Sequence, residues 1–366
     1  MTVRMRRALS LGLAALLALG LAGCVDEGAQ PSAPASHTPD HTVFTPWEGE
    51  DRFAELDQYV MEIGHVQPED NPRHISLLQF KEDVEQATCG HVRVVVRPNG
   101  ELGTEEELLQ QVMAGNIQGM RGGQYNYSPR LLMFTLPFLT QNRAQITALL
   151  QSELAQRVCQ ECGEQTGTVI LNVCDAGGYR QLSSAKGPIK SPEDMKGLKM
   201  RTNGMKTTDM TMKALGAEVM SIPYNSLYTA LKGGVADGQD NPWINTQQKK
   251  FYEVQPYFTD INYQFHVDPF FVNAAWWNSL PQELREVITP CAVDMGMYND
   301  QIIDENNQVA MDAIASADNV EIYTPTQEEL EAFREAVQPV YEECVAQGIC
   351  TQEELEEMRQ IVEAAQ

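Results

Sequence analysis

The chain has 366 residues, and its formal charge of −25 at neutral pH comes from 51 acidic against 26 basic side chains. This excess of acid argues against binding to nucleic acid or to an anionic lipid surface by charge attraction. The length suits two domains around more than one core. An anionic ligand would need cations held locally in its site.

The first 23 residues have the pattern of an export signal. Three arginines and no acid precede the apolar run LGLAALLALGLAG, which is too short for a membrane span. The tetrad LAGC, which ends at Cys24, resembles the lipobox of bacterial lipoproteins, in which cleavage leaves a lipid-modified cysteine as the N-terminus. Cleavage there removes the three arginines and leaves a charge of −28. The alternative is an ordinary signal peptide with a chance cysteine.

A segment rich in Pro, Ser, Ala and Asp follows Cys24 and shows no apolar periodicity. It is typical of a flexible tether, which we place at residues 24–54. The sequence therefore predicts a periplasmic protein held at a membrane by a lipid anchor alone, with its folded body beginning near residue 55.

Eight cysteines occur in the chain. If Cys24 carries lipid, seven remain, and at least one has no partner within the chain. Cys159 and Cys162 have redox spacing, but they fall late in a helical pattern, whereas active pairs lie at a helix N-terminus. We interpret them as structural or as plain thiols. The run CVAQGIC, Cys344 to Cys350, could close a small disulfide loop. Zinc, phosphate-loop and nucleophile motifs are lacking. We predict no cofactor and no metal ligand, and the sequence leaves open whether a metal ion assists ligand binding.

In chain order, the first elements are strands and one well-marked helix. YVMEIGHV and HVRVVVRPNG are rich in β-branched residues and predict strands. TEEELLQQVMAGN opens with a capping box of Thr104 and Glu107 and stops near Gly115, which predicts a helix. GTVILNVCDAGGYRQLSS predicts a long strand with a glycine break.

The next elements alternate between strand and helix. SPEDMKG predicts a short helix capped by Ser191, LKMRT a strand, TTDMTMKALG a helix, EVMSI a strand, YNSLYTALKGG a helix and VADGQD a strand. This order is typical of a parallel sheet with crossover helices. Two helices that begin with Thr-x-x-Glu follow near the C-terminus. Ligands gather at the carboxyl ends of such strands, where Arg201 and Asn241 stand.

The stretch SPEDMKGLKMRTNG…MKALGAEVMSIPYNSLYTALKGGVADGQDNP…KFYEVQPYF resembles the solute-binding proteins of tripartite ATP-independent periplasmic (TRAP) transporters, of the dicarboxylate-binding type. RPNGELGTEEELLQQVMAGN, LPFL and WWNSLPQELREVI extend the likeness from about His65 to Val293. The resemblance implies a receptor and no enzyme, with a type II-like periplasmic-binding-protein fold of two α/β domains. Each domain would be a mixed, mostly parallel sheet flanked by helices. The domains would close over a small organic acid and deliver it to the small and large permease subunits.

The resemblance also implies domain boundaries. Residues 55–177 with about 267–306 would form the first domain, and residues 178–266 with about 307–366 the second, which includes the C-terminal helices. The ligand cleft would lie between them.

Four residues match the ligand-binding positions of the family. Arg201 matches the main carboxylate clamp, and Arg180 the second arginine. Asn241 matches the asparagine after Asp-Gly-Gln, and Tyr224 the aromatic that covers the ligand. A guanidinium suits this task because its planar fork of donors fits a carboxylate bidentately. The alternatives are a surface ion pair for each arginine, a turn for Asn241 and a core position for Tyr224.

Five further residues are weaker candidates: Arg121, Tyr125, His65, His266 and Trp243. Arg121 and Tyr125 stand where the first domain of the family faces the ligand. A third arginine there could meet a second acidic group or a sulfonate, or it could be a surface residue. The two histidines are more often structural, and Trp243 stands where the family commonly has a smaller aliphatic residue.

The sequence departs from the family pattern at two more positions, and it leaves two other functions open. Asp240 and Ser226 stand where the family usually has glutamate; the first change keeps the charge and the second removes it. One alternative function is a ligand-binding sensor for a membrane kinase. The other is an exported enzyme for small acids with Asp240 and His266 as an acid–base pair, although no nucleophile or metal motif supports it.

Overall fold

The structure is a computed structural model that describes residues 47–365, which belong to one compact unit. The expected signal peptide, Cys24 and most of the expected tether lie outside the described residues. The last tether residues contact the body: the carboxylate of Asp51 lies 2.9 Å from Nε2 of His91, and Phe53 is buried. Between residues 47 and 365, no helix combines the length and apolarity needed to cross a membrane.

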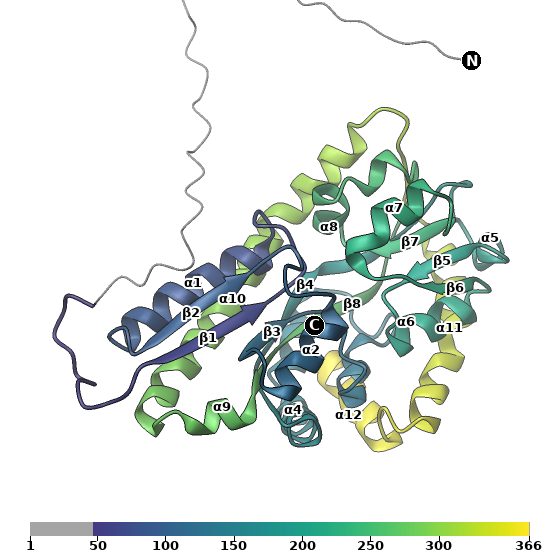
Figure 1. Cartoon of the computed structure of the whole chain (residues 1–366). Helices are drawn as coiled ribbons and strands as arrows, with labels where there is room; N and C mark the ends of the chain where they lie inside the picture. Colours follow the sequence, from purple (N-terminus) through teal and green to yellow (C-terminus); the bar gives the residue numbers. More distant parts are fainter. Residues whose placement is uncertain (1–46, 366) are drawn as a thin grey trace, which may run out of the picture. The chain divides into compact units, whose positions relative to one another are not determined.

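The described residues form one mixed sheet in which the strands follow the order β2-β1-β3-β8-β4-β7-β5-β6, with β9 also paired to β8 (Figure 1). The parallel pairs are β1 with β2 and β3, β5 with β6 and β7, and β8 with β9; β8 pairs antiparallel with β3 and β4, and β4 with β7. The strands are β1 (Tyr59–Gly64), β2 (Val92–Arg97), β3 (Gly119–Arg121), β4 (Thr168–Ser184), β5 (Lys199–Thr202), β6 (Glu218–Ser221), β7 (Gly238–Asn241), β8 (Tyr257–Asn273) and β9 (Glu321–Tyr323).

Helices cover both faces of this sheet. The α-helices are α1 (Pro72–Ala87), α2 (Glu105–Ala114), α3 (Arg143–Leu150), α4 (Glu153–Thr166), α5 (Pro192–Met195), α6 (Lys206–Ala214), α7 (Leu227–Lys232), α8 (Trp243–Gln248), α9 (Ala274–Ser279), α10 (Gln282–Ala315), α11 (Gln327–Ala346) and α12 (Gln352–Ala364). Short 3₁₀ turns are η1 (Pro129–Thr135), η2 (Tyr224–Ser226) and η3 (Phe251–Glu253). The predicted fold class, a mixed α/β periplasmic-binding-protein type, is confirmed.

Two lobes share the sheet. We call β1–β3 with α1 and α2 the first lobe, and β5–β7 with α6–α8 the second lobe. The long antiparallel strands β4 and β8 run through both. The predicted domain boundaries at 177/178 and 266/267 fall inside β4 and β8, and that at 306/307 falls inside α10. The division into domains at those residues stays a prediction.

The predicted glycine break lies in the middle of β4. The pairing with β8 shifts register between Asp175 and Tyr179. Gly177 and Gly178 have φ angles of +132° and +94°, which favour glycine because it has no Cβ. Their N–H groups donate to Oδ1 of Asp175 at 2.8 and 2.5 Å. The carboxylate thus holds the bend, and Arg180 follows it at the passage between the lobes.

The predicted helix starts are confirmed. Capping boxes join Thr104 with Glu107, Thr326 with Glu329, and Thr351 with Glu354, and Ser191 pairs in the same way with Asp194. Each threonine oxygen accepts from an N–H that the helix leaves without a partner, and the Ser191 hydroxyl donates to the carboxylate of Asp194.

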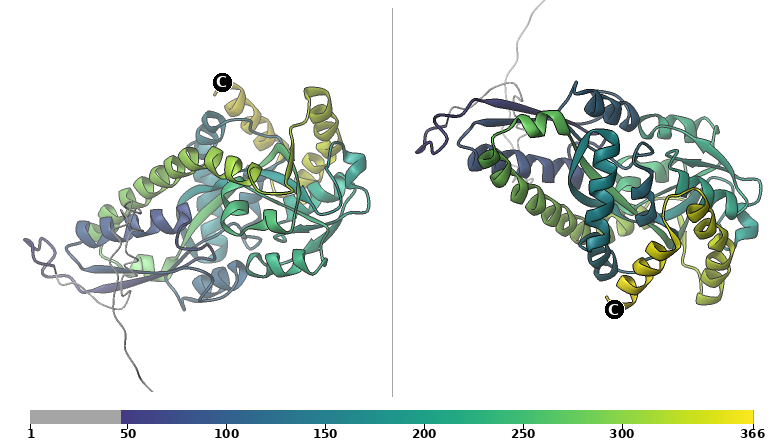
Figure 2. Two further views of the ribbon diagram at one scale, coloured as in Figure 1. Left: turned by 90° about the horizontal axis from the view of Figure 1, so that it is seen from above. Right: turned by 90° about the horizontal axis from the view of Figure 1, so that it is seen from below.

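Two large apolar clusters anchor the elements that carry the site. One lies among α1, β1, β2 and the first half of α10, and includes Phe80, Val94 and Ile288. The other extends from α2 and α4 to α6, α11 and α12 and includes Leu109 and Met212. Figure 2 shows α10 as a long helix beside α1, and it also contacts β4 and α8. This helix therefore spans both lobes.

The seven described cysteines, from Cys89 to Cys350, are all unpaired. The structure does not form the disulfide that Cys344 and Cys350 could close. Cys159 and Cys162 lie late in α4, as predicted, and burial raises their pKa values to about 12 and about 11. Since the thiolate is the reactive form, these two are inert thiols at neutral pH.

Candidate functional site

A small cavity of about 30 Å³ lies where the strand ends of the two lobes meet. Its walls come from both lobes and from β4 and β8: Gln67, Arg73, Glu105, Gly123, Ala176, Arg180, Arg201, Asn203, Tyr224, Asn241, Asn245 and His266. The structure thus brings together the four main predicted residues and His266. It leaves Arg121, Tyr125, His65 and Trp243 outside the cavity wall.

Arg201 is a buried cation that forms no ion pair with a carboxylate between residues 47 and 365. It is the next-to-last residue of β5, the strand between β6 and β7, and is 1% exposed. Its Nε donates to the carbonyl oxygen of Ile222 at 2.8 Å, while Nη2 has no hydrogen-bond partner among the described residues. Burial lowers its pKa to about 10, and Asp240 partly opposes that shift. The guanidinium therefore stays charged at neutral pH and is available to an anion.

Arg180, in contrast, is already neutralised. Its Nε donates to the carboxylate of Asp240, and its Nη2 donates to the carbonyl oxygen of Asp240 at 2.6 Å. The hydroxyl of Tyr263 donates to the same carboxylate. Burial disfavours both charges, but their attraction outweighs it, raising the pKa of Arg180 and lowering that of Asp240. The aspartate at the family's usual glutamate position thus fixes Arg180 at the cavity.

Arg73, at the start of α1, is a cavity residue that sequence reasoning missed. Its Nε donates to Asp268 at 2.7 Å and its Nη1 to Glu105 at 2.9 Å. The run NPRH signals a helix start at Pro72, but it does not mark the arginine as a cavity residue.

Arg121 lies behind Arg73. It is 0% exposed and donates to Asp268 at 2.9 Å and to Oγ of Ser76 at 2.9 Å. Arg121 therefore does not face the cavity, and it is not a surface residue either, because the buried carboxylate of Asp268 pairs with it.

Three other weak candidates pack behind the wall. Tyr125 is fully buried with its ring against His266 at a centroid distance of 6.2 Å. Nε2 of His65 lies 3.1 Å from Nδ1 of His74. Trp243 packs against Phe258. Their positions indicate packing roles.

His266 is a neutral ring in the cavity wall. Its Nε2 lies 2.7 Å from the carbonyl oxygen of Gly123, so Nε2 carries the hydrogen and donates it. Burial lowers its pKa to about 3, and Nδ1 is left as an acceptor with no partner among the described residues. The acid–base pair of Asp240 and His266 is not formed, since the hydrogen bonds of Asp240 go to Arg180 and Tyr263.

Tyr224 closes another side of the cavity. Its ring packs edge-on against Phe251, and burial raises its pKa. The hydroxyl has no hydrogen-bond partner among the described residues. Asn241, at the end of β7, donates to Oε1 of Gln239. Between residues 47 and 365, no cluster of three or more His, Cys, Asp or Glu side chains could hold a metal.

The two lobes are closed against each other around this cavity. Nδ2 of Asn203 donates to the carbonyl oxygen of Gly123 at 3.0 Å, and Nδ2 of Asn126 donates to that of Gly204 at 2.7 Å. An outer pocket of about 180 Å³ adjoins the cavity and shares Glu105, Asn203 and Tyr224 with it. A larger molecule would extend into that pocket.

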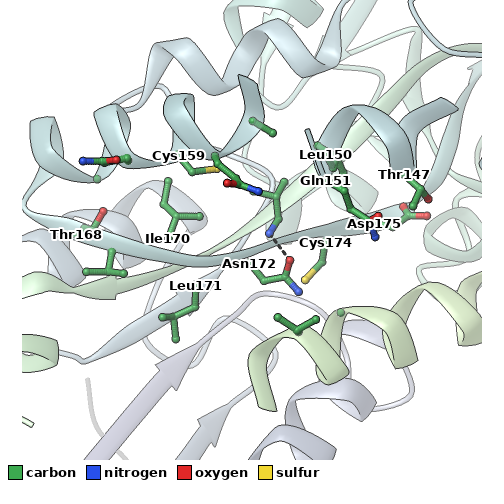
Figure 3. A pocket seen from close by; sticks show the side chains of 18 of the residues that line it. Thr147, Leu150, Gln151, Cys159, Thr168, Ile170, Leu171, Asn172, Cys174 and Asp175 are labelled. Atoms are coloured by element: carbon green, nitrogen blue, oxygen red, sulfur yellow. Dashed lines mark hydrogen bonds between the residues drawn. The ribbon is translucent and has the colours of Figure 1, made fainter. Parts of the chain in front are cut away.

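A larger groove of about 800 Å³ lies elsewhere, beside the first half of β4 (Figure 3). Its walls are mainly apolar residues of α3, α4, β4 and α10, and the cation among them, Arg143, is paired with carboxylates. Arg143 lies 2.7 Å from Asp175 and 2.6 Å from Asp304. Burial raises the pKa of Asp175 to about 6, against the opposing charge of Arg143. The groove therefore offers no free cation to an acid.

Two lobes on one sheet, closed over a cavity with an unpaired arginine, define a solute-binding protein. The family model described as bacterial extracellular solute-binding protein, family 7 (DctP), matches residues 63–347, and the chain belongs to this family.

Relatives support the same assignment. The chain is 30% identical over 288 residues to the C4-dicarboxylate-binding periplasmic protein DctP of Rhodobacter capsulatus, covering 78% of this chain and 86% of the relative. It is 25% identical over 267 residues to the 2,3-diketo-L-gulonate-binding periplasmic protein YiaO of Escherichia coli, covering 72% and 80%.

Solved structures are similar as well. The sugar acid binding protein DctPAm from Advenella mimigardefordensis, in complex with galactonate, matches with a TM-score of 0.80 and 27% identity, covering 85% of this chain and 100% of that one. A TRAP periplasmic solute-binding protein from Shewanella oneidensis with bound succinate matches at 0.78 and 27%, covering 84% and 99%. The predicted family is confirmed, and with it the class of function: a periplasmic solute receptor of a TRAP transporter rather than an enzyme.

Proposed function

We propose that the protein binds the carboxylate of a small organic acid at Arg201, in the cavity between the lobes, and delivers the acid to the membrane subunits of a TRAP permease. The observation that carries this proposal is that Arg201 is a buried guanidinium without a carboxylate partner among the described residues. A carboxylate would accept the unused donors of its fork bidentately.

The neighbours of Arg201 support this role in different ways. Arg180 lines the cavity, but Asp240 neutralises its charge and holds its donors. Tyr224 and Asn241 line the same cavity and offer polar groups to the ligand. The similar proteins with bound galactonate and succinate are consistent with an organic acid as the ligand.

Binding and closure are coupled in this proposal. The cavity is small, about 30 Å³, and hydrogen bonds join the lobes across it, so we expect an organic acid to enter when the lobes move apart. Once inside, it contacts Arg201 and Asn241 of the second lobe and Gln67 and Arg73 of the first. A ligand shifts the open–closed balance only by its affinity difference between the two states. Contacts to both lobes supply that difference.

A thermal-shift screen of the mature protein against organic acids tests the proposal. A ligand that binds only the folded state raises the unfolding midpoint by mass action. We expect an acid to raise the midpoint of the parent, its uncharged amide analogue to leave it unchanged, and the Arg201→Met variant to lose the response. A folded parent that responds to no organic acid would contradict the proposal.

We also propose that Cys24 is lipid-modified and tethers the receptor to a membrane. The LAGC tetrad supports this. Mass spectrometry of the membrane fraction should find an acylated N-terminal cysteine, and the Cys24→Ser variant should appear in the soluble periplasmic fraction. An unmodified N-terminus beyond Cys24 would overturn the anchor and leave the receptor function untouched.

A further inference from the structure

The charged side chains around the cavity have a net charge that one anion would neutralise. We call the following set the buried charge cluster: Arg73, Arg121, Arg180 and Arg201, with Glu105, Asp240 and Asp268. Four cations against three anions give a net charge of +1. His266 adds nothing, because burial keeps it neutral. A monoanion on Arg201 therefore brings the cluster to neutrality, whereas a dianion leaves one buried negative charge uncompensated, which is costly.

Charges just outside the cluster have opposite charges of their own: Asp300, which also interacts with Arg121, lies 3.5 Å from Arg143. Lys249 lies over the ring of Tyr224 at 5.5 Å, does not line the cavity, and is opposed by Asp70. Asp209 is opposed by Lys213. Glu106, in the wall of the outer pocket, adds a negative charge there and further disfavours a second carboxylate.

Buried hydrogen-bond acceptors of the site lack a donor among the described residues. Nδ1 of His266 and Oδ1 of Asn126 have no hydrogen-bond partner among the described residues. Both orientations are fixed, because the opposite nitrogen of each side chain donates to a carbonyl oxygen, that of Gly123 or of Gly204. A carboxylate has no hydrogen to donate to these atoms, but a hydroxyl does.

From these observations we infer that the ligand is a monocarboxylic acid that carries hydroxyl groups, and that dicarboxylic acids bind more weakly. The carboxylate sits on Arg201, one hydroxyl donates to Nδ1 of His266 in the cavity, and another reaches Oδ1 of Asn126 in the outer pocket. This inference rests on the proposed function and assigns the substrate class of the same site.

A set of four acids of equal length separates charge from hydroxyl content. At six carbons the probes are gluconate, hexanoate, glucarate and adipate; at four carbons they are threonate, butyrate, tartrate and succinate. Calorimetric titration of the mature protein should give the tightest binding for the hydroxylated monocarboxylate of one length. We expect each of its three partners to bind at least about tenfold more weakly, since each lacks donors or adds a buried charge.

Two variants sharpen the test. His266→Phe keeps an aromatic ring but removes the acceptor, so we expect the hydroxylated acid to lose about tenfold more affinity than its hydroxyl-free partner. Glu105→Gln raises the net charge of the cluster to +2, so the affinity ratio of glucarate to gluconate should rise about tenfold. The matched control is Glu101→Gln, at an exposed site of the same lobe, which should leave that ratio unchanged.

The outcomes separate the two proposals. If succinate or adipate binds tighter than every hydroxylated monocarboxylate, the inference is overturned and the receptor function stands. Equal losses for hydroxylated and hydroxyl-free acids in His266→Phe would also overturn it, because they would mark a structural role. If none of the eight acids nor any other organic acid binds the folded parent, both proposals fail.

Discussion

The groove beside β4 is larger than the Arg201 cavity, but its arginine is compensated by carboxylates and Arg201 is not. The groove measures about 800 Å³ and the cavity about 30 Å³. In the groove, Arg143 is compensated by nearby carboxylates, whereas in the cavity Arg201 has none. An uncompensated buried charge costs free energy that the fold does not recover by itself. The uncompensated charge of Arg201, rather than pocket volume, is therefore the feature on which we propose the ligand site.

The largest effect on stability is expected when the ion pair of Arg180 and Asp240 in the cavity wall is broken. In Asp240→Asn the partner of Arg180 loses its charge, and a buried arginine is left unpaired. We expect the free energy of unfolding to fall by about 3–5 kcal/mol, measured by urea denaturation. The control Glu218→Gln, on an exposed side chain of β6, should change it by less than about 0.5 kcal/mol. Equal changes in both variants would show that the pair does not hold the cavity.

Replacement of Arg201 should separate binding from stability. Arg201→Met removes the partner of the ligand carboxylate, so affinity should fall by about 2–5 kcal/mol, or roughly 30- to several-thousand-fold. The ligand-free protein should become more stable by about 1–3 kcal/mol, because the variant no longer buries an unpaired cation. Calorimetric titration and thermal unfolding measure the two quantities. Unchanged affinity would remove Arg201 from the site.

The free energy of unfolding should depend on pH through Asp175, which lines the groove. Its pKa is raised to about 6 in the folded state by burial, from about 3.9 in the unfolded chain. Between these values the folded state holds more protons, so this group's contribution to the free energy of unfolding falls as pH rises from about 4 to 6, by about 1–3 kcal/mol. Urea denaturation across that range should show the slope, and Asp175→Asn should flatten it. A parent and variant with the same slope would exclude Asp175 as its source.

The smallest effect is expected from the groove surface. Met297 on α10 is 60% exposed and lines the groove. Met297→Glu adds a charge there, and we expect ligand affinity to stay within about twofold of the parent, measured by the same titration, because the groove holds no part of the ligand. A loss as large as that of Arg201→Met would reverse the comparison between the two regions.

Local signals in the sequence predicted much of this architecture. The capping box of Thr104 and Glu107 and the glycines after Asp175 act over a few residues, so the pattern itself specifies them. Arg201 was predicted because it ends a strand of a parallel sheet and matches a family position. Its lack of a carboxylate partner could not be predicted, since that depends on every neighbour in the fold.

Contacts between residues far apart in the sequence could not be predicted. Arg73 and Asp268 are 195 residues apart, and nothing near either residue indicates the pair. The same carboxylate binds Arg121, which explains why this arginine is withdrawn from the position that the family pattern implied. The 34 residues of α10 and the 17 of β8 were likewise not delimited, because both are continuous through segments that lie in different lobes.

The sharing of β4 and β8 by both lobes has a consequence for cooperativity. Both lobes use β4 and β8, so the unfolding of one lobe would remove strands that give backbone hydrogen bonds to the other. The body should therefore melt as a single thermodynamic unit, with equal calorimetric and van't Hoff enthalpies. In the proposed function, we expect the cleft to open by a twist of β4 and β8 that keeps their pairing intact. The receptor can thus release its cargo repeatedly while its fold stays intact.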